Sequence, residues 1–435
     1  MVSVSKDALE DPALSAFFIN EMEIEFSNYM NSGIIAVVNI YVLEGVWMEI
    51  RYPNYYKKFH CIAGDCPDTC CAGWEIPVDK ASELRYRQVR KSGNIQNKNF
   101  ARKLKKHVKH GRIISEDVTC PFLNRDGLCE MYIELGPEAL CHTCARHPRH
   151  LEDYGNLHEI VLLLSCPEAA RLILEENAGG FYIREFPQRQ GDVDGIDEDL
   201  LEILLKARDR IWKWNADDSM TVNESMALSI AFAHDLQRRR MEQDHAGMRL
   251  ILERYDTSEI AEKFRNQWSR KHGSEKEHTV RFLLMSDFME EFAGLETICR
   301  DWPEMLEECR TVLYHSKNSR ESYNAKHKYM EEIQPMTEMD KQRIFEYFIY
   351  SFFLPALYDE DLLTKVKMAV FCTMAVEELY LAAKQMDPAH RIEICHAIAR
   401  QIENCDENRA QLEHILKQKQ FSSRRIINAL LRMEE

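Results

Sequence analysis

The sequence predicts a mainly α-helical protein. A small, irregular α+β domain, rich in cysteine and predicted to bind metal, is followed by a larger helical domain. Nine of the 14 cysteines lie between Cys61 and Cys166. From Pro167 onward, apolar residues recur every three or four positions, which is typical of amphipathic helices. The length of 435 residues and the 45% hydrophobic composition allow a substantial core and two or three domains.

Residues 1–47 are predicted to be an N-terminal appendage. An acidic opening is followed by the apolar stretch Gly33–Val42, whose β-branched residues favour a strand. The opening lacks the basic-then-apolar order of a cleavable signal peptide, so we expect a cytoplasmic protein. A start codon assigned upstream of the true one would explain this prefix, because a plausible domain begins at Met48.

The predicted cysteine-rich domain spans residues 48–175. In a reducing compartment, such crowding of cysteines is typical of metal binding or redox chemistry. The alternative is a mixture of buried thiols and disulfides. Nine candidates are more than one four-ligand site needs. Either there are two sites, or some of these cysteines are packed in the core or are reactive thiols. The candidate metal ligands are Cys61, Cys66, Cys70, Cys71, Cys120, Cys129, Cys141, Cys144 and Cys166.

Two of the cysteines are expected on one short helix. The sequence Gly136-Pro137-Glu138 is typical of a helix start, because proline at the first helical position costs no hydrogen bond. Cys141 and Cys144 would then lie three residues apart on one face, where both thiols can reach one metal ion. Proline at position 148 cannot continue this helix, which we expect to end near Arg146.

The remaining cysteines have local signals of their own. Cys166 is predicted to cap the helix Ala169–Glu176, whose N-terminal N–H groups and dipole would stabilise a thiolate. Cys120–Cys129 predicts a β-hairpin with an Asn-Arg-Asp-Gly turn, which would bring the two terminal sulfurs close together. Adjacent Cys70 and Cys71 point in different directions in most backbone conformations, so only one is expected to share an ion with its neighbours.

The spacing does not decide between zinc and an iron-sulfur cluster. Neither a zinc-ribbon pair of Cys-x2-Cys motifs nor a standard ferredoxin run is present. The Cys-x3-Cys-x2-Cys triad of radical S-adenosylmethionine chemistry is also absent. Cys66 and Cys70 have the first spacing, but residue 73, where the third cysteine would lie, is glycine. Histidines in the same region are further ligand candidates, although each is expected to make a structural hydrogen bond. They are His60, His142, His147, His150 and His158.

Charge and hydropathy narrow the possible partners. A formal net charge of -16 argues against general nucleic-acid binding. The alternative is that the net charge serves only to keep the protein in solution. The stretch Arg85–Arg112 holds eleven lysines and arginines and no acid. It is predicted to be a solvated helix and loop, or a site for a phosphate-bearing cofactor or an acidic protein partner. No apolar run reaches the length of a membrane span; Gly33–Val46 and Ile344–Tyr358 are predicted to be buried segments.

Residues 176–435 form the predicted helical domain. Polar breaks are expected at Gln188–Asp199 and His315–Lys328, and the aromatic stripe within Phe345–Phe353 is expected in the core. The helices predicted from periodicity are Leu200–Trp214, Arg281–Phe292, Arg343–Tyr358, Leu362–Lys384, Arg391–Glu403 and Ser423–Met433. The single cysteines of this domain, predicted to be core thiols, are Cys299, Cys309, Cys372, Cys395 and Cys405.

Four stretches together resemble the flagellin lysine-N-methylase family. They are Tyr56–Trp74, Cys120–Cys129, Leu140–Arg149 and Leu164–Leu172. The match begins near Met48 and is sharp to Leu174; beyond that it is diffuse, with Tyr347–Lys367 as its best remaining stretch. Residues 120–148 are also loosely similar to small zinc- or iron-chelating domains.

The resemblance implies an enzyme that transfers methyl groups from S-adenosylmethionine to lysine side chains of flagellin before export. It also implies that the cysteines hold a 4Fe-4S cluster, either structural or in contact with the cofactor. Flagellin is therefore the expected partner, and the oligomeric state is left open. The chain contains no Gly-x-Gly, so the usual glycine-rich cofactor loop is absent, and no residue stands out as catalytic or cofactor-binding. The alternative is a non-enzymatic iron-sulfur or zinc protein that binds and organises a protein partner.

Overall fold

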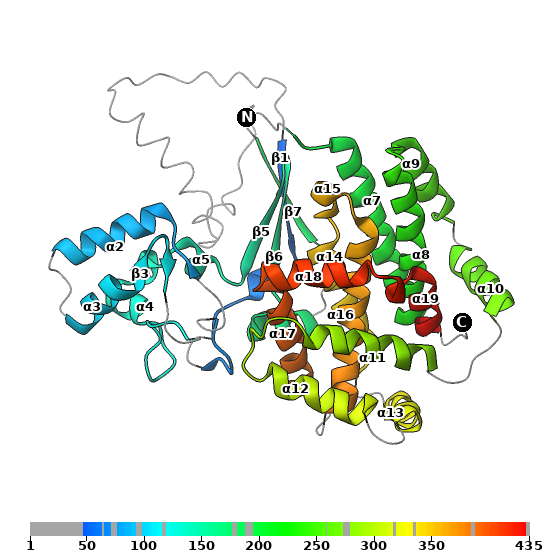
Figure 1. The fold of residues 1–435 in the computed structure, drawn as a ribbon. Helices are drawn as coiled ribbons and strands as arrows, with labels where there is room; N and C mark the ends of the chain where they lie inside the picture. The colour runs from blue at the N-terminus through cyan, green and yellow to red at the C-terminus, as the bar shows by residue number, and fades with distance from the viewer. Residues whose placement is uncertain are drawn as a thin grey trace, which may run out of the picture. The chain divides into compact units, whose positions relative to one another are not determined.

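The computed structural model describes residues 47–431, apart from 63–64, 71–75, 93–97, 115–118, 176–180, 188–194, 258, 273–278, 316–318, 334–335 and 384–387. In this part the protein is mainly helical, as predicted, and every described strand precedes helix α7 in the chain (Figure 1). The strand predicted at Gly33–Val42 lies outside the described residues, as does Cys71.

Four strands form a sheet in the order β5-β6-β1-β7. β1 (Trp47–Pro53) pairs parallel with β6 (Leu157–Leu162) and antiparallel with β7 (Phe181–Pro187), and β5 (Arg149–Tyr154) is antiparallel to β6. Gly155 in the β5–β6 turn has a φ of 79°, which glycine adopts without steric cost. This sheet was not predicted from the sequence, because β1 pairs with strands that lie about a hundred residues later in the chain.

Residues 76–146 form a small lobe around a core that includes Tyr86, Phe100, Phe122 and Met131. Its sheet has the order β2-β4-β3. The elements are β2 (Ile76–Pro77), α2 (Lys80–Ser92), α3 (Lys98–His107), β3 (Val108–Lys109), β4 (Arg112–Ile113), α4 (Glu130–Leu135), a 3-10 helix (Pro137–Ala139) and α5 (His142–Arg146). The basic stretch forms α2 and α3, and α3 buries Phe100 and Leu104 while its lysines face outward, which confirms a solvated helical segment.

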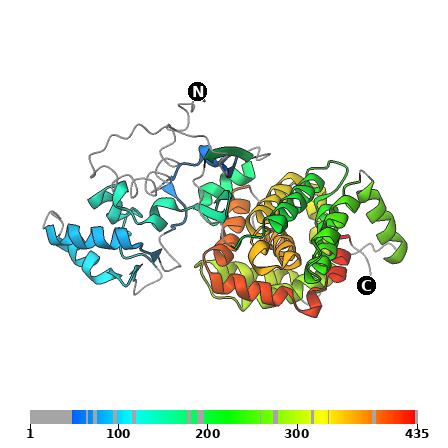
Figure 2. The same ribbon diagram turned by 90° about the horizontal axis from the view of Figure 1, so that it is seen from above.

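The remaining helices form a body around α16 (Leu362–Ala382), which is buried along its whole length (Figures 1 and 2). Helices α8, α12, α14, α17 and α18 pack against it. The other elements are α6 (Pro167–Glu175), α7 (Glu198–Asn215), α8 (Val222–Met241), α9 (His245–Arg254), α10 (Ile260–His272), α11 (Thr279–Ala293), α12 (Trp302–Cys309), the π-helix η5 (Arg310–Tyr314), α13 (Ser319–Ile333), α14 (Glu338–Phe352), α15 (Ala356–Asp359), α17 (Pro388–Glu403), α18 (Asp406–Leu416) and α19 (Ser423–Leu431).

Most of the predicted helices are confirmed within a few residues. Proline at position 355 divides the predicted Arg343–Tyr358 helix into α14 and α15. The predicted break at His315–Lys328 is wrong, because α13 begins inside it and buries Tyr323 and His327 against the body. The aromatic stripe of α14 is buried as predicted, and so are the single cysteines except Cys299, which is half-buried.

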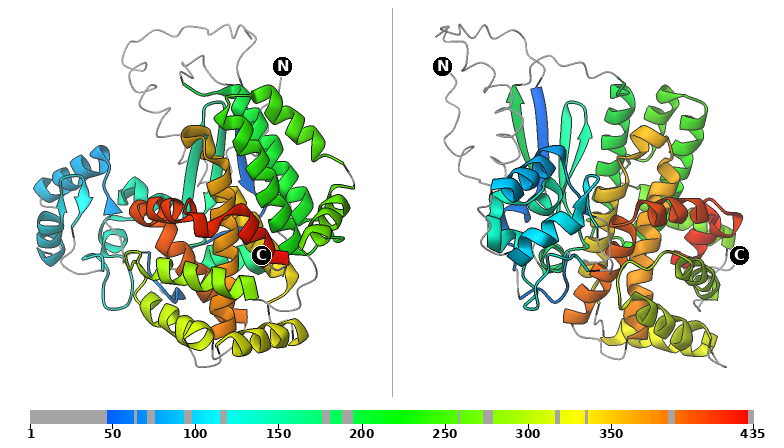
Figure 3. Two further views of the ribbon diagram at one scale, coloured as in Figure 1. Left: turned by 45° about the vertical axis from the view of Figure 1, so that its right-hand side comes forward. Right: turned by 60° about the vertical axis from the view of Figure 1, so that its left-hand side comes forward.

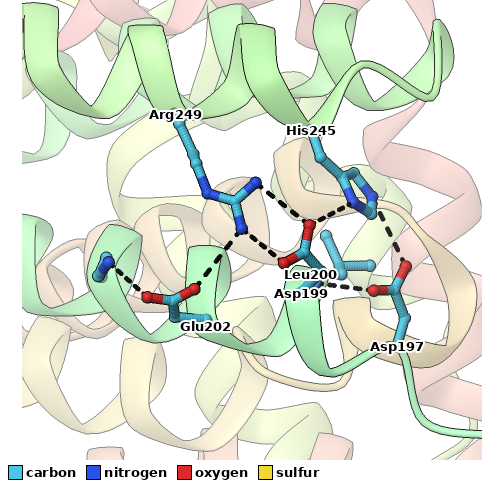
Figure 4. A network of polar contacts seen from close by, with 7 residues as sticks. Asp197, Asp199, Leu200, Glu202, His245 and Arg249 are labelled. Atoms are coloured by element: carbon cyan, nitrogen blue, oxygen red, sulfur yellow. Dashed lines mark hydrogen bonds and ion pairs between the residues drawn. The ribbon is translucent and has the colours of Figure 1, made fainter.

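Helix starts in the body follow local capping chemistry. Thr221 and Thr337 each form a capping box at the starts of α8 and α14. At the start of α7, the side chain of Asp197 accepts a hydrogen bond from the N–H of Leu200, and Asp199 binds Arg249 of α9 at 2.6 Å (Figure 4). These α7–α9 ion pairs are largely exposed, so they align two helices and contribute little stability.

The sheet and the body meet at α7 and α14. Figure 3 shows α7 beside the four-stranded sheet, and the guanidinium of Arg208 on α7 donates two hydrogen bonds to Glu159 of β6, at 2.7 and 2.5 Å. The Tyr350 hydroxyl of α14 donates to the carbonyl oxygen of Ile160 at 3.2 Å. Within the described part of the chain, no helix combines the length and apolar character needed to cross a bilayer.

Candidate functional site

The described cysteines of the predicted metal domain divide into two neighbourhoods. Cys141 belongs to the core of the small lobe, and Cys120, Cys129 and Cys144 pack against the same core. Cys61, Cys66 and Cys166 form the second group. Burial and then the nearby thiols of Cys66 and Cys61 raise the pKa of Cys166, and burial, Asp68 and Cys61 raise the pKa of Cys66. Cys70 is exposed in the loop that carries Cys66.

The first neighbourhood is built by a turn and a short helix. The predicted hairpin is reduced to one bridge, between Leu123 and Cys129, although its turn forms around Asn124, whose side chain accepts backbone hydrogen bonds. The predicted helix start is also displaced. Residues 137–139 form a separate 3-10 helix, and α5 begins only at His142, with Cys141 as its N-cap.

Cys141 has a more acidic thiol than Cys166. A hydrogen bond from the Cys144 thiol, together with the N–H groups of Cys144 and Thr143, lowers the pKa of Cys141 to about 7 against the effect of burial. The prediction that the helix start would favour a thiolate at Cys166 is wrong. Backbone hydrogen bonds at the start of α6 do act on it, but burial and the neighbouring thiols outweigh them and raise the pKa of Cys166 to about 11.

These sulfurs do not converge on one point. Among the residues that the structure describes, no three or more Cys, His, Asp or Glu side chains form a group that could hold a metal ion. The donor chemistry suits zinc or an iron-sulfur cluster, since both prefer thiolates. The present geometry does not fit either centre, so the metal site remains a prediction.

The candidate histidines make local contacts. His60 is exposed and lies 3.0 Å from the carbonyl oxygen of Lys58, and the backbone N–H of His142 donates to Asp79. On the β5–β6 hairpin, His150 pairs with Glu152 and His158 with Asp153. Burial lowers the pKa of the remaining candidate, His147, to about 4, with added repulsion from Arg400 and His396. The expected structural hydrogen bonds are therefore confirmed at His60 and His150.

Helix α17 contacts the loop that carries Cys66 and Cys70. The Nε2 atom of His396 lies 2.7 Å from the Oδ2 atom of Asp68, and Arg400 donates to the same carboxylate. Arg400 also donates to the carbonyl oxygen of Thr69 at 3.0 Å. Burial alone would raise the pKa of Asp68, but the hydrogen bond from His396 and the charge of Arg400 lower it to about 2.

The end of α17 contacts the turn before Cys166. The carboxylate of Glu403 accepts a hydrogen bond from the N–H of Ser165 at 2.9 Å and another from the Tyr347 hydroxyl. That hydroxyl accepts from the N–H of Leu164 at 2.9 Å. Burial raises the pKa of Glu403 to about 7 despite these donors. Burial likewise raises the pKa of Glu346, on α14, to about 7, against the charge of Arg343.

The raised pKa of Glu403 predicts a pH-dependent stability. An unfolded glutamate has a pKa of about 4.5, so the native state binds more protons between about pH 4.5 and about pH 7, and stability falls as pH rises through this window. The loss for this one group is on the order of 3 kcal/mol. Replacing Glu403 by glutamine should therefore leave stability near wild type at about pH 5 and increase it at about pH 8. Urea unfolding of both proteins at the two pH values measures this; an equal difference at both would contradict it.

The polar contacts at α17 were not predicted from the sequence; they involve Asp68, His396, Arg400 and Glu403. A signal was present, since three of the four lie at helical spacing in the half of the helix that also carries Ile394, Ile398 and Ile402. Polar residues in such a stripe stay buried only when they have partners. Those partners are on segments more than two hundred residues earlier in the chain, which the stripe alone does not identify.

The fold and this site define a mainly helical protein whose C-terminal helices hold cysteine-bearing segments from its N-terminal half. Residues 208–428, about half of the chain, match the family model described as the FliB lysine N-methylase C-terminal domain. The chain belongs to the flagellin lysine N-methylase family, which confirms the resemblance seen in the sequence.

Curated relatives match over a shorter part. The chain is 33% identical over 134 residues to the flagellar biosynthetic protein FliU of Salmonella muenchen, covering 30% of this chain and 79% of that protein. It is 34% identical over 134 residues to a lysine-N-methylase of Salmonella typhimurium and 33% to one of Salmonella choleraesuis. Each of these two alignments spans 30% of this chain but only 33% of the relative. No solved structure matches the chain.

Proposed function

We propose that this protein is a methyltransferase that carries methyl groups from S-adenosylmethionine to lysine side chains of flagellin in the cytoplasm, before export. The match of residues 208–428 to the lysine N-methylase domain carries the proposal. The names of the relatives, lysine-N-methylase and flagellar biosynthetic protein, support the reaction and the flagellar substrate.

The proposed reaction sets two demands on the site. The lysine Nζ attacks the sulfonium methyl carbon, the carbon–sulfur bond breaks to leave S-adenosylhomocysteine, and the substrate amine loses one proton. The amine must be neutral when it attacks, so a proton acceptor with a pKa near neutrality is useful. Glu346 and Glu403 have such values, and both are half-buried; the carboxylate of Glu403 already accepts hydrogen bonds from Tyr347 and Ser165.

The cofactor must be bound without a glycine-rich loop, because the chain has no Gly-x-Gly. The predicted cysteine centre is independent of this reaction scheme, and no step is assigned to it. Iron and acid-labile sulfide with a brown absorption spectrum would identify a cluster. Stoichiometric zinc in a colourless preparation would identify the zinc alternative.

A transfer assay tests the proposal. Protein purified and reconstituted without oxygen is incubated with methyl-labelled S-adenosylmethionine and flagellin, and flagellin peptides are analysed for labelled lysine. We expect label on lysine that depends on both the protein and flagellin. A reconstituted, folded protein that transfers no label would instead favour a non-enzymatic protein that binds a flagellar partner.

A further inference from the structure

One face of α17 carries three polar side chains that all contact cysteine-bearing segments. His396, Arg400 and Glu403 are four and three residues apart, so they share a face of the helix. His396 and Arg400 are buried, with 7% and 3% of their surface exposed. Their neighbours in the helix, such as Ile394 and Ile398, are fully buried apolar residues. The polar face of α17 is therefore built into the interior and is not a solvated surface.

The middle of this face holds the first cysteine segment. Asp68 lies two residues from Cys66 and two from Cys70, and its carboxylate contacts both His396 and Arg400. Arg400 also fixes the backbone through the carbonyl oxygen of Thr69. A guanidinium that contacts a carboxylate and an adjacent carbonyl fixes the orientation of the loop as well as pairing with its charge.

The end of the face holds the second cysteine segment. Glu403 accepts from the N–H of Ser165, the residue directly before Cys166, and from Tyr347, which in turn accepts from Leu164. Two consecutive backbone N–H groups are therefore satisfied by the helical body. Because α6 also packs on α17, the start of the helix that follows Cys166 is fixed to the same element.

We propose that His396, Arg400 and Glu403 are positioning residues that hold the segments of Cys66 and Cys166 in fixed relation, so that the C-terminal helices complete the cysteine site. Arg400 contacts Asp68 and Thr69 of the first segment, and Glu403, three residues further along the same helix, contacts Ser165 of the second, so one helix holds both segments. The inference rests on the proposed function only for what the thiols do in the reaction. The polar face itself acts on the geometry of the thiols, whatever they bind.

Thiol mapping of the full chain tests this inference without methyl donor or substrate. Wild type, Arg400→Ala and Glu403→Ala are treated with iodoacetamide as purified without oxygen, and the alkylation rate of each cysteine is followed by peptide mass spectrometry. Each variant loses two hydrogen bonds that involve a charged group, which should speed alkylation of Cys66 in Arg400→Ala, and of Cys166 in Glu403→Ala, by about tenfold or more. Cys372, fully buried in α16, reports global opening and should not change.

Matched variants separate positioning from general damage. Arg400→Lys keeps a cation beside Asp68, and Glu403→Gln keeps an acceptor for Ser165, so both should restore most of the protection. Glu393→Ala removes an exposed side chain of the same helix that pairs with His390, and should behave as wild type. Unchanged rates at Cys66 and Cys166 in both alanine variants would overturn the inference. So would equal acceleration of Cys372, because the face would then support only the overall fold.

Discussion

Replacing Arg281 by methionine is expected to destabilise the protein by roughly 3–5 kcal/mol, because it leaves two buried carboxylates without their shared cation. Arg281 on α11 is 2% exposed; its Nε atom donates to Glu378 at 2.9 Å, and it also pairs with Glu377. Burial acts to raise the pKa of both glutamates, yet the charge of Arg281 lowers the pKa of each.

The side chains around Glu377 and Glu378 replace the charge of Arg281 only in part. Tyr314, which belongs to the π-helix η5, and Tyr323 of α13 donate hydrogen bonds to Glu378 at 2.8 and 2.7 Å. Lys341 lies 2.9 Å from Glu377. Two neutral hydroxyl donors, Lys341 and His327, which lies 3.6 Å from Glu378, would face two adjacent carboxylates in a low-dielectric interior, which favours uptake of a proton by one of them.

Urea unfolding measures the Arg281 effect directly. The matched control is Arg409→Met, which removes an arginine paired with Asp406 on the surface, and it should change stability by less than about 1 kcal/mol. Combining Arg281→Met with Glu378→Gln should recover part of the loss by removing one stranded charge. An Arg281→Met protein as stable as the control would show that this network does not support the fold.

The second large effect is expected at the junction of the sheet and the body. Arg208 of α7 and Glu159 of β6 are each 1% exposed and form two hydrogen bonds. The Arg208 guanidinium also lies 4.7 Å from the ring centre of Trp212 and 5.2 Å from that of Tyr350. Arg208→Met keeps much of the apolar contact but strands Glu159 on a central strand, so we expect a loss of about 3 kcal/mol or more.

Hydrogen exchange locates the Arg208 effect. Amide exchange should accelerate in β6 and β1, which are paired in the sheet, while α16 keeps its protection. The double variant Glu159→Leu/Arg208→Met should be closer to wild type than either single change, because apolar pairs often replace buried ion pairs at little cost. If β6 exchanges at its wild-type rate in Arg208→Met, the ion pair does not join these two parts.

The helical elements could be predicted because their signals are local. The periodicity of α7, α11, α16 and α17 reflects burial of one or more faces against neighbours, and it is visible in a single segment. The four-stranded sheet could not be predicted in this way. Its central strand β1 pairs with β6 and β7, and such distant pairing is decided by tertiary packing and not by the strand's own composition.

The candidate site was predicted in part. The cysteine crowding before residue 170 lies on the segments that α17 contacts, and the resemblance identified the family. The expected acidity of Cys166 was wrong because burial, which depends on the whole fold, outweighs the favourable helix start. Asp68 and Glu403 were not predicted because the partners that make them informative, Arg400 and Ser165, are distant in sequence.

Methylation of flagellin in cells tests the central claim most directly. The chain is produced together with flagellin in bacteria that have no flagellin methylase of their own, and flagellin produced alone is the control. The account predicts lysine-containing flagellin peptides that are heavier by whole methyl increments only when the chain is present. Flagellin whose lysines stay unmodified beside an abundant, folded chain would contradict the account.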